Sequence, residues 1–164
     1  METADVRRRL RAAIEQARRT GQERRSRRDA ASKEYDQFLE RAGAVFQMFA
    51  AALTGEGHRF KAFTPAGSVR LVSETASDDF IEIVLDTETD PPSVMGRSNR
   101  GRGRRTITNE RPVKEGASVS ELTEEDVLSF LLAEIADFKR QRAPAGRGPE
   151  HVEPSGGQAC LTRL

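Results

Sequence analysis

The chain has 164 residues, of which 36% are hydrophobic and 32% are charged, and its formal net charge is +1. This length fits one domain with a helical extension and a tail, and the composition allows only a small core. The single cysteine excludes an intrachain disulfide and a Cys-based zinc site, and no apolar run reaches the length of a membrane span. The Arg-rich start lacks the apolar segment of a secretory signal, so we expect a cytoplasmic protein without a membrane partner.

Charge is segregated along the sequence. Residues 1–28 carry ten arginines against four acidic residues, and residues 74–90 carry seven acidic residues and no basic one. Residues 97–105 carry five arginines and no acidic residue. Blocks of opposite sign attract one another or a charged partner.

The longest periodic segment predicts one amphipathic helix from about residue 3 to residue 53. Its apolar side chains recur at alternating steps of four and three, which is the seam of a heptad repeat. Gly21 weakens such a helix, so an alternative has two helices that meet there, but we favour a single helix that ends at Gly55 or Gly57. The seam positions are Val6, Leu10, Ala13, Ala17, Thr20, Arg24, Arg27, Ala31, Tyr35, Phe38, Ala42, Val45, Phe49 and Ala52.

After His58 the periodicity changes to two, which predicts β-strands. Short turns between the strands favour antiparallel pairing. Residues 93–103 contain three glycines and are predicted to be a loop. We expect the arginines of the last strand to lie opposite Glu82 and Asp86. The four predicted strands cover residues 60–63, 68–74, 80–86 and 104–111.

A second helix is predicted to begin after Thr123, because Thr123 and Asp126 have the spacing of a capping box. Residues 142–164 are rich in proline and glycine and show no periodicity, which predicts a disordered C-terminal tail. The apolar face of the second helix consists of Val127, Leu128, Leu131, Leu132, Ile135 and Phe138.

These elements predict an α+β fold with a long N-terminal helix, a small four-stranded antiparallel sheet and a C-terminal helix packed on one sheet face. Residues 1–28 form an Arg-rich helical extension, residues 29–141 the α+β domain and residues 142–164 the tail. The order of elements is similar to that of the YbaB-type nucleoid-associated proteins. The predicted fourth strand and the tail differ from the pattern of that family. This resemblance of layout implies a dimer that binds DNA.

The residue types that perform nucleophilic or acid–base catalysis are few. His58 lies at a helix-to-strand junction, whereas His151 and Cys160 lie in the predicted tail, where no packed scaffold would hold them together. The glycines of residues 96–103 lead into a strand and lack the nucleotide-binding fingerprints. We therefore expect no catalytic residue and no cofactor.

Asp86, Glu88 and Asp90 alternate with threonines, so the three carboxylates lie on one face of an extended segment. A hard cation accepts such ligands, but a calcium loop requires Gly and Glu where this chain has Pro91 and Arg97. The alternative interpretation is a charged strand edge that discourages pairing between molecules. We favour that alternative and expect no metal ion.

The arginines form two groups, one on the N-terminal helix and one near residue 100, and both are candidates for gripping phosphates. No aromatic residue is interleaved with them, so binding would be directed at the nucleic-acid backbone and would depend steeply on salt. The alternative is a solvated helix face and a loop paired with the acidic strand. The candidate residues are Arg7, Arg8, Arg11, Arg18, Arg97, Arg100, Arg102, Arg104 and Arg105.

The N-terminal helix is longer than the sheet can cover. A four-stranded sheet is about 20 Å wide, whereas the helix would extend about 75 Å. We therefore predict a non-catalytic interaction module that dimerises or docks a partner through this helix. The alternatives are a nucleic-acid-associated protein and an enzyme subunit with a carboxylate metal site. The predicted partner-binding residues are Val6, Leu10, Ala13, Ala17, Tyr35 and Phe38.

Overall fold

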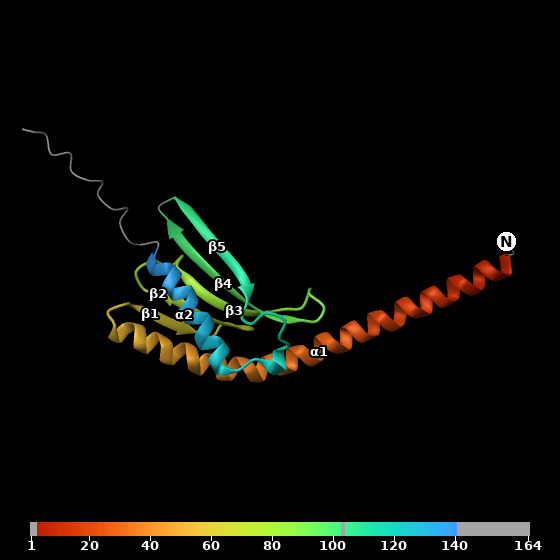
Figure 1. The fold of residues 1–164 in the computed structure, drawn as a ribbon, viewed down its shortest axis with the longest axis horizontal. Coiled ribbons are helices and arrows are strands. Elements are labelled where there is room, and N and C mark those ends of the chain that lie inside the picture. Colours follow the sequence, from red (N-terminus) through yellow and green to blue (C-terminus); the bar gives the residue numbers. More distant parts are fainter. Residues whose placement is uncertain (1–2, 103, 141–164) are drawn as a thin grey trace, which may run out of the picture.

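The computed structural model describes residues 3–102 and 104–140. It shows an α+β fold in which two helices cover one face of an antiparallel sheet, while the N-terminal half of the first helix extends away from the rest (Figure 1). The fold class is as predicted, although the sheet has five strands instead of four. The elements are α1 (Thr3–Gly55), β1 (Phe60–Phe63), β2 (Ser68–Ser73), β3 (Phe80–Asp86), β4 (Ser93–Arg102), β5 (Arg105–Pro112), the 3-10 helix η1 (Val119–Glu121) and α2 (Glu124–Arg140).

Helix α1 runs without interruption through Gly21, which confirms the single-helix prediction. It ends in a Schellman motif, in which the Gly57 N–H donates to the Thr54 carbonyl at 3.0 Å and the His58 N–H donates to the Leu53 carbonyl at 2.8 Å. Gly57 has φ of 81°, a left-handed conformation that glycine adopts without steric cost. The sequence prediction of a glycine stop is therefore confirmed.

The five strands form a meander in which each strand pairs with the next. The prediction of a loop over residues 93–103 was wrong, because residues 93–102 form β4. Glycine is required within this strand, since a Cβ at Gly96 would lie 2.1 Å from the Phe130 ring of α2. The predicted fourth strand is observed as β5.

Because β4 lies between β3 and β5, the predicted pairing of the last strand with Glu82 and Asp86 was also wrong. Arg97 of β4 is the residue opposite Glu82, but its Nε donates to Glu110 of β5 at 3.1 Å. Glu82 instead accepts from Arg70 of β2, with 2.9 Å between Nη2 and Oε1. Charged residues of neighbouring strands thus pair on the outer sheet face.

The core lies between the inner sheet face and the two helices. Val69 and Leu71 of β2 and Ile81 and Ile83 of β3 are fully buried. Helix α1 contacts β1 and β2, and α2 contacts β4, so the predicted cover of one sheet face by both helices is confirmed. Neither described helix has an apolar stretch long enough to cross a membrane.

Helix α2 begins with the predicted capping box. The Asp126 N–H donates to Thr123 Oγ1 at 3.3 Å, and the Thr123 N–H donates to Asp126 Oδ2 at 2.9 Å. These hydrogen bonds from the Thr123 backbone and hydroxyl hold the pKa of the Asp126 carboxyl below its usual range. The predicted tail, residues 142–164, lies outside the described residues.

Candidate interaction surface

Helix α1 consists of two parts that differ in exposure. From Thr3 to Arg27, every residue except Asp5 is exposed. From Ala31 onward, the helix supplies a continuous series of buried residues to the core. We name residues 3–27 the arm, and residues 28–102 and 104–140 the body.

The predicted partner-binding residues fall in both parts. Val6 and Leu10 of the arm are 46% and 57% exposed, and Ala13 and Ala17 are exposed as well. Tyr35 and Phe38, in contrast, are only 3% and 1% exposed, because they cover the protein's own sheet. In this structure, only the arm residues of the predicted set are accessible to a partner. Ile14, which is 53% exposed, joins them although the heptad count did not include it.

The exposed apolar side chains of the arm lie on the same side of α1 as the buried ones of the body. Ala17 and Tyr35 are separated by 18 residues, which is about five helical turns. Leu10 and Phe46 are separated by 36 residues, about ten turns. One face of α1 is therefore buried at its C-terminal end and bare at its N-terminal end. We name the bare part the arm stripe: Val6, Leu10, Ala13, Ile14 and Ala17.

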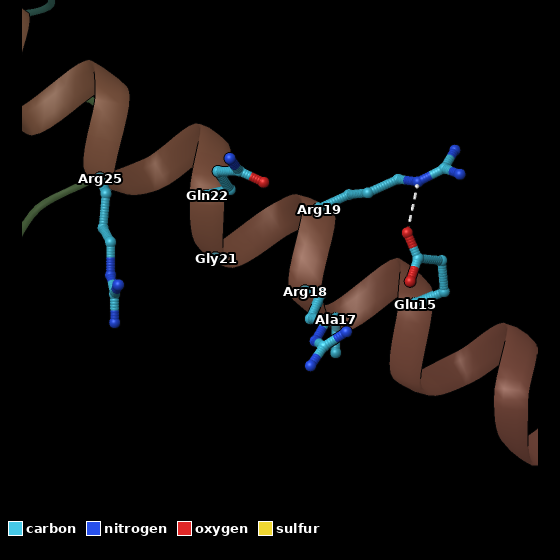
Figure 2. A pocket seen from close by; sticks show the side chains of 7 residues that line it. All are labelled: Glu15, Ala17, Arg18, Arg19, Gly21, Gln22 and Arg25. Atoms are coloured by element: carbon cyan, nitrogen blue, oxygen red, sulfur yellow. Dashed lines mark hydrogen bonds and ion pairs between the residues drawn. The ribbon is translucent and has the colours of Figure 1, made fainter.

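Ion pairs link residues one turn apart within the arm. Asp5 pairs with Arg9 at 3.2 Å and Glu15 pairs with Arg19 at 3.3 Å, both one turn apart. Figure 2 shows the Glu15–Arg19 pair on one side of the helix and Arg18 on the other. Gly21 leaves open space beside the helix, so the hollow there is a notch in one helix and not an enclosed site.

An acidic loop contacts α1 where the arm meets the body. Asp90 pairs with Arg27 at 3.1 Å and with Arg24 at 3.5 Å, and Glu88 pairs with Arg28 at 3.7 Å. The two arginines at seam positions, Arg24 and Arg27, are thus paired with Asp90. Asp90 belongs to the carboxylate cluster that the sequence analysis considered as a metal site. Asp86 accepts a hydrogen bond from the Glu88 N–H at 2.8 Å. Within the described ranges, no group of three His, Cys, Asp or Glu residues is arranged to hold a metal ion.

Two of the predicted phosphate-binding arginines near residue 100 form ion pairs within the protein. Arg97 pairs with Glu110, and Arg100 is buried, with its Nη2 3.1 Å from Oε2 of Glu134. Arg104 and Arg105 remain exposed at the turn between β4 and β5, where Arg102 ends β4. Among the described side chains of this group, Arg97 and Arg100 are therefore engaged in ion pairs, whereas Arg104 and Arg105 are exposed.

The arginines of the arm are arranged differently. Arg7, Arg11 and Arg18 are exposed, and no ion pair with another described residue involves them. Arg8 pairs with Asp5. The arm thus carries a basic surface beside its apolar stripe.

Sequence reasoning missed a buried ion pair network between α2 and the sheet. Glu134 is 2% exposed and accepts from Arg100 and from Arg111, whose Nε lies 2.8 Å from Oε1. The two guanidinium groups also lie over the rings of Phe138 and Phe130, at 4.3 Å and 4.9 Å from the ring centroids. The available signal was an acidic residue at the edge of the apolar face of α2, one turn after Phe130 and one turn before Phe138.

The Tyr35 hydroxyl is a structural group. It lies 3.2 Å from both the Gly67 and the Ile83 carbonyl oxygens and donates to them, which ties α1 to β3 and to the turn before β2. Burial, followed by the charges of Glu82 and Asp36, raises the pKa of this hydroxyl well above its usual range. The Tyr35 hydroxyl is therefore not ionised near neutral pH.

A second apolar surface lies in a groove between α1 and α2. Met48 is 64% exposed there, and Glu124 and Glu125 form an acidic rim. The apolar lining of the groove consists of Val45, Met48, Phe49, Ala52 and Leu128.

The chain matches no known protein family, no characterised protein and no solved structure at a significant level. Its function must therefore be inferred from its own surfaces. The arm stripe has the strongest features of an interaction surface, because it combines exposed large apolar residues with a length that the body does not cover.

Proposed function

We propose that the chain is a non-catalytic interaction module that self-associates through the arm. The observation that carries this proposal is the exposure of Val6, Leu10 and Ile14 on the same helix face that is buried in the body. Exposed apolar residues in a row on a helix are characteristic of a helix–helix interface.

The energetics of isolated helices support the same proposal. The arm is about 37 Å long, and a helix that packs against nothing is marginal in water. Its ion pairs each contribute only about 0.3–0.5 kcal/mol. Packing of the arm stripe against another surface would supply the stabilisation that tertiary contacts supply to most protein helices.

Sedimentation of matched variants tests this proposal. We expect the unmodified chain to show a dimer at rising concentration, and Leu10→Lys to remain monomeric because a charge would be placed in the stripe. Ala12→Lys adds the same charge on another side of the arm and should still dimerise. A monomeric unmodified chain at the highest soluble concentration would contradict self-association.

Nucleic-acid binding is a second candidate function, favoured by the exposed Arg7, Arg11 and Arg18. Binding through these residues would be electrostatic and would weaken steeply as salt rises. A gel shift with duplex DNA across salt should show weaker binding and a smaller salt slope when all three are changed to alanine. Arg97→Ala is the control, because Arg97 is paired with Glu110. Absence of any shift at about 50 mM salt would rule this candidate out.

A further inference from the structure

We infer that the surface that covers the arm stripe is the arm of a second copy running in the opposite direction. This inference rests on the proposed self-association and adds its direction and its register. It is drawn from the side of α1 on which the body lies, from the order of large and small residues in the stripe, and from the position of the acidic loop.

The position of the body excludes a parallel pair. The body lies on the stripe side of α1, since Tyr35 and Ala17 are about five turns apart on one face, and its contacts with α1 begin at Arg24. Paired helices are only about 8–10 Å apart. In a parallel pair, both bodies would have to fit between the two helices directly after the arms. An antiparallel pair places the bodies at opposite ends, where they do not collide.

The order of residue sizes in the stripe favours the same direction. At the seam positions of the stripe, Val6 and Leu10 are in the first half and Ala13 and Ala17 are in the second half, where Ile14 lies beside the seam. Antiparallel pairing places Val6 opposite the partner's Ala17, and Leu10 opposite the partner's Ala13. Each of these seam layers then contains one large and one small side chain, which favours a constant separation of the two helices along the seam. A parallel pair would stack two large layers followed by two alanine layers.

The acidic loop supplies charge complementarity in this register. Thr3, where α1 begins, would lie opposite the partner's Thr20, about 6 Å before Arg24 along the helix. The positive end of each helix dipole would then point towards the loop that carries Glu88 and Asp90 on the other copy. Glu88 has an 86% exposed side chain, so it is accessible to such an approach. The symmetry is isologous and closes as a dimer.

Disulfide cross-linking tests the direction. The test uses the full chain with Cys160→Ser, so that only introduced cysteines react. In the inferred register, Val6→Cys/Ala17→Cys brings each cysteine opposite its counterpart, and we expect covalent dimers in a glutathione redox buffer. Val6→Cys alone and Ala17→Cys alone should give at least about tenfold less covalent dimer, because like positions would be about 16 Å apart and a disulfide needs Cα atoms within about 7 Å.

Arg8→Cys/Arg19→Cys is the matched control, with the same separation in sequence but on the side of the arm away from the stripe. It should form no more dimer than the single variants. Efficient cross-linking of Val6→Cys alone would overturn the inference in favour of a parallel pair. A dimer in sedimentation that Leu10→Lys abolishes, together with no cross-link in the double variant, would overturn the register while the proposed function stands. A monomeric unmodified chain would instead refute the proposed function itself.

Discussion

The arm and the body contain the same helix with the same apolar face, yet that face meets protein in one part and water in the other. Phe38 in the body is 1% exposed and Leu10 in the arm is 57% exposed. Periodicity determines which side of a helix is apolar. Whether that side is covered depends on how far the sheet extends, which is a property of the whole fold.

The largest expected contrast comes from truncating one apolar side chain in each part. Phe38→Ala should lower the free energy of unfolding by about 3–5 kcal/mol, because it leaves a cavity between α1 and the sheet. Leu10→Ala should change it by less than about 0.5 kcal/mol in dilute solution. Urea unfolding followed by far-UV circular dichroism measures both. Equal losses for the two variants would show that the arm is packed as tightly as the body.

The buried charge network offers the next largest effect. Glu134→Gln should destabilise the body by about 3 kcal/mol, because Arg100 is then left buried without its counterion. Glu125→Gln, at an exposed position near the start of the same helix, is the control and should be nearly neutral. If Glu134→Gln left the free energy of unfolding unchanged, the ion pair network would not be needed to hold α2 on β4.

Two interior glycines of α1, one in the arm and one in the body, allow the two parts to be compared through smaller effects. Gly43→Ala should stabilise the body by about 0.5–1 kcal/mol, since the new Cβ would meet Thr64 Cγ2 at an ordinary 3.5 Å. Gly21→Ala has open space around it and should raise the helicity of the arm without changing the urea midpoint of the body. Circular dichroism at low urea and at the midpoint distinguishes the two effects. A shift of the midpoint by Gly21→Ala would mean that arm and body unfold as one unit.

The smallest expected effect concerns pH. The pKa of Asp126 is lowered in the folded state, so its stabilising contribution is present above the unfolded pKa of about 3.9 and is lost as the pH falls through the lower folded value. Asp126→Asn should therefore weaken the dependence of stability on pH below about pH 4. Urea midpoints at several acidic pH values measure this, with Glu124→Gln as the control. An unchanged pH dependence would assign the capping to the Thr123 hydroxyl alone.

Most of the fold followed from local patterns. The glycine stop after α1, the alternation in β3 and the cap of α2 each depend on residues within a few positions of one another, so the sequence displays them directly. The seam likewise indicated the arm stripe, because periodicity is a local property.

Strand β4 could not be predicted because its features are explained by distant residues. Arg100 lies on the inner sheet face only because Glu134, 34 positions later, neutralises it. The Phe130 ring packs against Gly96, where a side chain would not fit. From the sequence alone, this glycine was interpreted as a loop residue. The pairing of Arg24 with Asp90 is equally remote in sequence, so this contact between α1 and the acidic loop could not be predicted either.

The Tyr35 hydroxyl, held between two backbone carbonyls, has a practical consequence. The chain contains one tyrosine and no tryptophan, so its intrinsic ultraviolet emission arises from a position inside the body. That emission should change when the body unfolds and should not change when the arm frays. Because the pKa of this phenol is raised, tyrosinate absorbance should also emerge at alkaline pH only once the core opens. The molecule therefore carries a built-in spectroscopic reporter for one of its halves.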